Sequence, residues 1–127
     1  MRFKDLKAQY HALKPQIDSA IQSVLDTSEF ILGAPVEKLE KTLAAYVGRK
    51  HCITCANGTD ALQLALMAMG VGQGDAVFTS DFTYIASAGA ASLLKAEVIF
   101  ADIDERTFNI SPESLEKAIN HVILEGK

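Results

Sequence analysis

The sequence predicts an α/β fold, with βαβ units around a mainly parallel sheet. Three short apolar segments, residues 52–56, 76–79 and 98–101, have the length of buried strands. Segments with apolar residues at helical spacing, residues 60–69 and 85–94, lie between them. Strands that alternate with helices of this length form parallel sheets, because a parallel pair needs a crossover connection.

Two amphipathic helices are predicted ahead of the first strand. Apolar residues recur at helical spacing from Leu6 to Leu25, and Pro15 predicts a break between a short helix and a longer one. The second helix covers residues 36–47, and Gly48 stands where a left-handed C-terminal cap belongs.

The loop between these helices, residues 27–35, breaks the helical period and ends in Gly and Pro. It carries Phe30, Ile31 and Leu32, an unusual set for a solvated loop. We therefore expect it to be buried against another surface.

In the rest of the chain, glycine and proline mark the ends of predicted helices. Gly70 closes the helix over residues 60–69, and Ser111-Pro112-Glu113 opens the last helix with a cap residue followed by proline. The glycine-rich segment at residues 70–75 follows a helix and precedes a strand, the reverse of the order that a dinucleotide-binding fingerprint needs. It is therefore interpreted as a cap and a turn.

Composition and charge exclude several classes of protein. Hydrophobic residues make up 49% and charged residues 22% of the 127 residues, as in a globular domain. The net charge is -4 and no run of Lys or Arg offers a track for a phosphate backbone, so nucleic acid is not an expected partner. The N-terminus lacks an apolar signal segment and no stretch has the length of a membrane span, so we expect a cytoplasmic protein without membrane contact.

Cys52 and Cys55 form a C-x-x-C pair, which suggests either a redox pair or half of a metal site. On the strand predicted for residues 52–56 their side chains point to opposite faces, and no second cysteine pair completes a zinc site. Both are interpreted as buried structural cysteines, and no metal is expected.

The segment at residues 55–62 combines the end of a strand, a glycine-containing turn and the start of a helix. Such a turn directs free backbone N–H groups and the positive end of a helix dipole at one point, where an anion fits. Gly58 permits a close backbone approach, Thr59 adds a hydroxyl donor, and Asp60 suits the first helical turn. The residues alone leave two interpretations open: a phosphate cradle, or an ordinary helix cap formed by Asn57 or Thr59.

The segment at residues 79–84 leaves a strand at the same carboxyl edge of the sheet, where open α/β sheets bind ligands. Phe82 and Tyr84 offer flat faces to a planar ligand, or else pack against the protein. The acidic segment at residues 102–105 has no further oxygen or imidazole ligand at loop spacing and is interpreted as a solvated turn.

From Phe30 onward the sequence resembles the DegT/DnrJ/EryC1/StrS sugar aminotransferase family, within the fold type I enzymes that use pyridoxal 5'-phosphate. The motifs that carry the resemblance occur in family order: Phe30-Ile31-Leu32-Gly33, Val47-Gly48, Asn57 to Leu62, Gly74-Asp75, Phe82 to Ala86 and Asp102-Ile103-Asp104. The resemblance implies that residues 1–127 are the N-terminal part of the large domain of such an enzyme, apparently truncated.

The resemblance also implies roles for individual residues. Gly58, Thr59 and Asp60 match the turn that binds the cofactor phosphate, and Tyr84 matches the aromatic residue that lies against the pyridine ring. The loop from Phe30 to Gly33 matches a segment near the substrate, at the interface of a homodimer. Phe3-Lys4-Asp5-Leu6 and Cys55-Ala56-Asn57 are similar to members that aminate UDP-linked 3-keto sugars for surface polysaccharides.

Two family residues have no match in this chain: the aspartate that holds the pyridine nitrogen and the lysine that forms a Schiff base with the cofactor. Lys95, Lys117 and Lys127 follow the cofactor loop, but none lies in a Ser-x-x-Lys context. We therefore assign no catalytic residue and expect the chain alone to be inactive, as a fragment of an enzyme that takes an amino group from a donor such as glutamate. Two alternatives stay open: a sugar dehydratase of the same fold, and a non-catalytic module that binds phosphate or acts by protein contacts.

Overall fold

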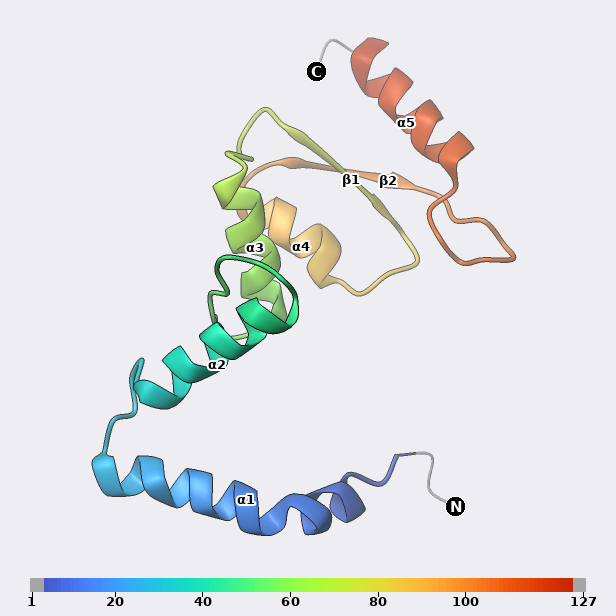
Figure 1. The fold of residues 1–127 in the computed structure, drawn as a ribbon. Helices are drawn as coiled ribbons and strands as arrows, with labels where there is room; N and C mark the ends of the chain where they lie inside the picture. Colours follow the sequence, from blue (N-terminus) through green and yellow to red (C-terminus); the bar gives the residue numbers. More distant parts are fainter. Residues whose placement is uncertain (1–3, 125–127) are drawn as a thin grey trace. The chain divides into compact units, whose positions relative to one another are not determined.

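The computed structural model describes residues 4–124 and divides the chain into two compact units, Met1–Thr54 and Cys55–Lys127 (Figure 1). The first unit holds helices α1 (Leu6–Thr27) and α2 (Ala34–Tyr46). The second unit holds two strands and three helices, in the order α3 (Gly58–Ala68), β1 (Ala76–Ser80), α4 (Ala86–Leu93), β2 (Glu97–Ala101) and α5 (Pro112–Leu124).

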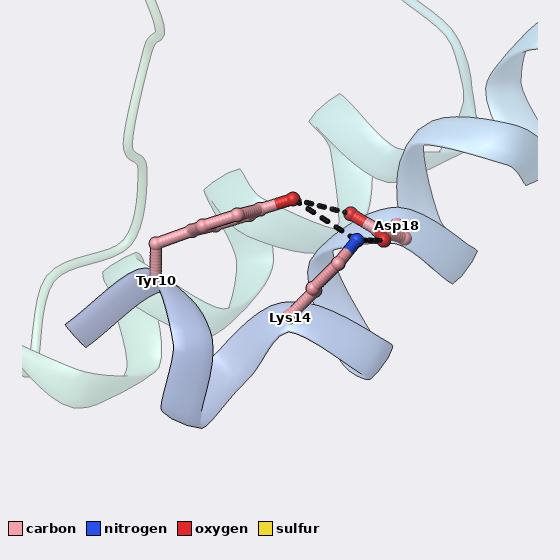
Figure 2. Close-up of polar contacts among 3 residues, drawn as sticks. All are labelled: Tyr10, Lys14 and Asp18. Atoms are coloured by element: carbon pink, nitrogen blue, oxygen red, sulfur yellow. Dashed lines mark hydrogen bonds and ion pairs between the residues drawn. The ribbon is translucent and has the colours of Figure 1, made fainter. Parts of the chain in front are cut away.

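Helix α1 runs without interruption through Pro15, so the predicted break at this residue is wrong. A proline inside a helix removes one backbone hydrogen bond and clashes with the preceding turn. Side chains bridge the turns on either side of it: Tyr10 Oη donates to Asp18 Oδ1 at 3.1 Å, and Lys14 Nζ donates to Tyr10 Oη at 3.2 Å (Figure 2). Lys14 also forms an ion pair with Asp18, which completes a cluster that spans the proline.

The charges of this cluster are mutually stabilised. The hydrogen bond from Lys14 lowers the pKa of Asp18, and the hydrogen bond to Asp18 raises the pKa of Lys14. Both groups are accessible to solvent, so the benefit is small and is screened by salt. The three side chains can meet because residues 10, 14 and 18 lie on one face of the helix.

Helix α2 begins two residues earlier than predicted, because Ala34 and Pro35, predicted as part of the loop, form its first turn. It ends at Tyr46, one residue before the predicted end. Gly33 is the N-cap residue and Pro35 lies in the first turn, where a missing N–H costs nothing. At the other end Gly48 has a φ of 66°, its N–H donates to the Ala45 carbonyl, and the N–H of Arg49 donates to the Ala44 carbonyl. This pair of hydrogen bonds is the Schellman cap expected at Gly48.

Residues 52–56 are not a strand, and this prediction is wrong. A strand is defined by its ladder partners, and among the described residues β1 and β2 pair only with each other. The backbone N–H of Thr54 instead donates to Glu40 Oε1 on α2 at 2.8 Å. The cysteines are not both buried as expected: Cys52 is half-buried, and Cys55 lies exposed at the turn ahead of α3, where its Sγ donates to the Asn57 carbonyl at 3.3 Å.

The sheet of the second unit is a parallel pair. β1 and β2 lie in register from Ala76 opposite Glu97 to Ser80 opposite Ala101, and α4 connects them. The strands predicted at residues 76–79 and 98–101, and the helix between them, are thus confirmed within one residue at each end. The parallel arrangement predicted from the alternation of elements is confirmed as well.

The core of the second unit is made of small residues. α4 packs against α3 and both strands, and α5 packs against β2. The buried hydrophobic residues here are Ala86, Ala90, Ala91, Ala96, Ala101 and Val122. Alanine on the covered faces of α4 lets helix and sheet approach closely, which sets where the loops at their ends lie.

The turn between α3 and β1 confirms the interpretation of its glycines. Gly70 has a φ of 80° and closes α3, and the N–H of Val71 donates to the Leu66 carbonyl. Asp75 Oδ2 accepts from the N–H of Gly72 at 2.8 Å, which folds the segment into a tight turn. No helix within residues 4–124 combines the length and the apolar character needed to cross a lipid bilayer.

Candidate functional site

The N-terminus of α3 is capped by Asn57. Its backbone is extended, and its side-chain Oδ1 accepts from the N–H of Asp60 at 3.0 Å. Asn57 Nδ2 in turn donates to Asp60 Oδ2 at 3.1 Å, and the Asn57 carbonyl accepts from the N–H of Ala61. Of the two cap residues that the sequence left open, the structure has Asn57, not Thr59.

The cap uses the backbone N–H of Asp60 and leaves two other backbone N–H groups at the turn. The backbone N–H groups of Gly58 and Thr59 have no acceptor among the residues that the structure describes. They are the first two amides of an 11-residue helix, at the positive end of its dipole. Thr59 is half-buried and adds a hydroxyl to the same turn.

The space above this turn is open. Gly58 is exposed, and a Cβ atom placed on it would meet no atom within 4 Å, so no other described residue covers the turn at this position. Two free amides and a hydroxyl at a helix N-terminus suit a phosphate group. Asp60 contributes the helix start, because its amide and carboxylate are both engaged with Asn57.

Tyr84 lies in the loop between β1 and α4, in the same unit as α3. α3 and α4 pack together, and in Figure 1 both helices start at the same end of the pair. The Tyr84 side chain is 76% exposed, and the carbonyl of Tyr84 accepts from the N–H of Ser87 at 3.0 Å. Within the described residues this ring faces solvent, and both roles that the sequence left open stay predictions.

Phe30 and Gly33 lie in the first unit, in the loop between α1 and α2. The loop borders an open hollow of about 610 Å³, lined by residues 28–34 and Glu37. Phe30 is 66% exposed, and a Cβ on Gly33 would stand 3.0 Å from the Glu29 carbonyl oxygen, so a side chain there would crowd the loop backbone. Gly33 therefore has a structural role in the loop besides the one predicted for substrate.

Three interactions were not predicted from the sequence. Glu40 accepts from both the amide and the hydroxyl of Thr54, and the ring of Phe82 contacts that of Phe108. In the third, Asp104 caps the turn that follows it. For the first two contacts, the sequence around each residue does not indicate its partner. Asp104 differs, because an aspartate ahead of a polar turn often forms such hydrogen bonds.

The Asp104 turn agrees with the interpretation of residues 102–105. Asp104 Oδ1 accepts from the N–H groups of Thr107 at 2.9 Å and Arg106 at 3.1 Å. These hydrogen bonds, that of Thr107 first, lower the pKa of the Asp104 carboxyl. Within residues 4–124 no group of three His, Cys, Asp or Glu side chains is arranged to hold a metal ion.

The family model of the DegT/DnrJ/EryC1/StrS aminotransferases matches residues 11–123. The chain belongs to this family. Its fold class is thereby confirmed: it has the α/β architecture of the N-terminal part of a fold type I pyridoxal-phosphate aminotransferase.

Individual relatives agree with this membership. The chain is 52% identical over 119 residues to the UDP-2-acetamido-2-deoxy-3-oxo-D-glucuronate aminotransferase of Pseudomonas aeruginosa, covering 94% of this chain and 33% of that protein. It is 49% identical over 115 residues to a pleiotropic regulatory protein of Geobacillus stearothermophilus, covering 91% of this chain and 31% of that protein.

Solved structures of the family have the same fold. An aminotransferase of the family from Brucella abortus superposes with a TM-score of 0.91 at 44% identity, over 99% of this chain and 34% of that one. DesV of S. venezuelae, solved in complex with a ketimine intermediate, gives a TM-score of 0.85 at 40% identity, over 92% of this chain and 32% of that one. The chain thus spans about a third of the length of the relatives it matches.

Proposed function

We propose that the natural protein containing this chain transfers an amino group from an amino acid, glutamate in the first instance, to a keto group of a nucleotide-linked sugar. Family membership and the identity to an aminotransferase of a UDP-linked 3-oxo sugar support this reaction. A transaminase of a dTDP-linked sugar, from Streptomyces venezuelae, is 41% identical over 117 residues. A UDP-linked 3-keto sugar used for surface polysaccharide is the substrate class that the opening motifs favour.

The open N-terminus of α3 is the single observation that carries the proposal for the cofactor. Its free amides at Gly58 and Thr59, with the Thr59 hydroxyl, fit the phosphate of pyridoxal 5'-phosphate. Asp60 holds the turn through Asn57, and the exposed Tyr84 ring offers a face to a planar heterocycle. When bound, pyridoxal phosphate supplies the electron sink that amino transfer requires.

Phe30 and Gly33 form the substrate side of the proposal. The hollow at their loop is lined by the apolar side chains of residues 30–32 and 34 and by the polar side chains of Ser28, Glu29 and Glu37. We assign this loop to the sugar substrate and to the interface of a homodimer, in keeping with its exposed apolar residues. Cytoplasmic location and absence of membrane contact remain predictions, which cell fractionation tests.

The proposal is tested with the longest natural polypeptide that contains this sequence. We expect it to turn yellow on addition of pyridoxal phosphate, and to consume glutamate when a UDP-linked 3-keto sugar is supplied. The polypeptide of residues 1–127 alone is expected to lack this activity, because none of its lysines lies in the Schiff-base context of the family. Glutamate consumption by residues 1–127 would contradict that expectation.

A non-catalytic role is the second candidate, and the similarity to a pleiotropic regulatory protein favours it. Titration with pyridoxal phosphate distinguishes the aminotransferase from the non-catalytic module. A natural protein that shows no absorbance change with pyridoxal phosphate, yet binds inorganic phosphate, would act as a binding module. A dehydratase of the same fold would instead bind the cofactor and release water from the sugar without leaving an amino group on the sugar product.

A further inference from the structure

Two aromatic rings from distant parts of the second unit meet beside the loop of Tyr84. The ring centroids of Phe82 and Phe108 are 5.6 Å apart, with the planes inclined at 35°. This distance lies in the favourable range for an aromatic pair. Phe82 is 64% and Phe108 58% exposed, so the pair lies at the surface and is not part of the alanine-rich core.

Phe108 reaches this contact through an uncommon backbone conformation. Its φ is 58°, in the left-handed region that a bulky side chain rarely adopts. Such a conformation persists only where the surrounding structure imposes it. Asp104 imposes it here: its carbonyl accepts from the N–H of Phe108 at 2.9 Å, and its N–H donates to the Asn109 carbonyl at 2.8 Å.

Further contacts hold the whole turn in place. The Asp104 carboxylate accepts from two amides inside the turn, and Ile103 bridges to Ile110 across its base. The N–H of Ser111 donates to the Asp102 carbonyl at 2.8 Å, which ties the turn to the start of α5. The turn is thus a rigid support that presents the Phe108 ring.

The loop between β1 and α4 needs such a support. It carries Phe82 and, two residues later, Tyr84, whose side chain has no hydrogen bond or ring contact within residues 4–124. The position of the Tyr84 ring therefore depends on the backbone of the loop. That backbone is held on the helix side by Thr83 and Ser87, whose hydroxyl oxygens are 3.2 Å apart, and on the other side by the Phe82 ring.

We propose that Phe108 is a positioning residue, whose ring holds Phe82 and thereby fixes the loop that presents Tyr84 to the cofactor. The inference rests on the proposed function, because it assigns Phe108 a task toward the same ligand. It also gives a reason for the left-handed phenylalanine: the turn keeps the ring at Phe82, where a glycine or asparagine would suit the backbone better.

Substitutions at position 108 separate the ring from the backbone. Phe108→Asn removes the ring and keeps a residue that tolerates the left-handed conformation, whereas Phe108→Tyr keeps the ring. In the natural protein we expect Phe108→Asn to weaken the binding of pyridoxal phosphate about three- to ten-fold, the size of one aromatic pair contact. Its melting temperature should stay the same or rise, since the backbone is relieved, and Phe108→Tyr should bind as the unsubstituted protein does.

A second background shows whether the effect passes through Tyr84. In a Tyr84→Ala protein, Phe108→Asn should cause no further loss of cofactor affinity, because the ring that it positions is already absent. The circular dichroism of the cofactor absorption band should also fall in Phe108→Asn alone, since a less ordered ring contact lowers the asymmetry around the cofactor.

Three results would overturn the inference. One is a Phe108→Asn protein that binds the cofactor as tightly as the unsubstituted protein. Another is a loss of affinity that accompanies a lower melting temperature and persists in the Tyr84→Ala background, which would make Phe108 a folding residue. The third is an unsubstituted protein that binds no pyridoxal phosphate, which overturns the proposed function as well and so differs from the first two.

Discussion

Both the backbone amide and the side-chain hydroxyl of Thr59 are proposed to bind the cofactor phosphate. It offers a free amide and a hydroxyl at the N-terminus of α3. We expect Thr59→Ala to weaken pyridoxal phosphate binding roughly ten- to hundred-fold, since one hydrogen bond to a charged group contributes about 1.5–3 kcal/mol. Thr59→Ser keeps the hydroxyl and serves as the control. Titration by absorbance gives the dissociation constants, and equal values for Thr59→Ala and the unsubstituted protein would exclude the hydroxyl as a ligand.

Tyr84 is proposed to act through its face, not its hydroxyl. Tyr84→Phe should therefore bind the cofactor nearly as the unsubstituted protein does, because the ring survives. Tyr84→Ala should both weaken cofactor binding and slow turnover, since a ring that is not held flat is poorly oriented for proton transfer. Absorbance titration and single-turnover kinetics measure the two effects. If Tyr84→Ala binds the cofactor with unchanged affinity, Tyr84 has no stacking role.

At the scale of elements, the cluster across Pro15 is expected to add a small local stabilisation to α1. Asp18→Ala removes the acceptor of both Tyr10 and Lys14 and leaves the proline without its bridge. We expect faster hydrogen exchange of the amides around Pro15, with little change near the helix ends. Lys7→Ala, on the same helix but outside the cluster, is the control. High salt should reduce the difference between the two variants, because it screens the ion pair, and equal exchange in both would show that the cluster does not support the helix.

Glu40 joins α2 to the segment before the second unit, and the contact depends on pH. The hydrogen bonds from the Thr54 amide and hydroxyl lower the pKa of Glu40 below its ordinary value of 4.5. The carboxylate therefore adds stability that is complete above pH 4.5 and is lost as the pH falls through the lowered pKa. Protection of the Thr54 amide from exchange should follow that curve. In Glu40→Ala the protection should be low at every pH, whereas a protein with the same pH dependence as the unsubstituted one would contradict the assignment.

The elements that the sequence predicted correctly are those fixed by local chemistry. The α4 helix, both strands and the glycine caps at Gly48 and Gly70 follow from periodicity and backbone preference within a few residues. The two failures have a non-local cause. Whether residues 52–56 pair as a strand depends on a partner strand, and around Pro15 side chains two turns apart meet across the proline.

At the scale of the whole chain, the candidate site also has parts that local sequence predicts and parts that depend on long-range contacts. The turn at Gly58 and Thr59 was predictable, because a helix start with glycine has free amides wherever it lies. The support of Tyr84 was not, because Phe82 and Phe108 are brought together only by the packing of β2, its following turn and the loop after β1. Long-range contacts of exposed rings leave no periodic signal in a sequence.

The distribution of apolar residues predicts that residues 1–127 associate when isolated. Among residues 4–124 the buried hydrophobic residues are alanines and one valine, whereas Phe30, Ile31 and Leu32 are 66%, 86% and 75% exposed. Within residues 4–124, each strand of the β1–β2 pair also has one side without a strand partner, which favours pairing between molecules. We expect light scattering to give masses above the 13.7 kDa of one chain, rising with concentration.

Replacing the loop residues separates the two causes of this association. A Phe30→Ser, Ile31→Ser double variant should associate less if the loop is the contact, because its apolar area is removed while the strands are untouched. Lys4→Ser, at an exposed polar position outside the loop, is the matched control and should associate as the unsubstituted chain does. Association that is unchanged in the double variant would assign the contact to the strand edges. A constant mass of 13.7 kDa across the whole concentration range would show that neither surface recruits a second chain.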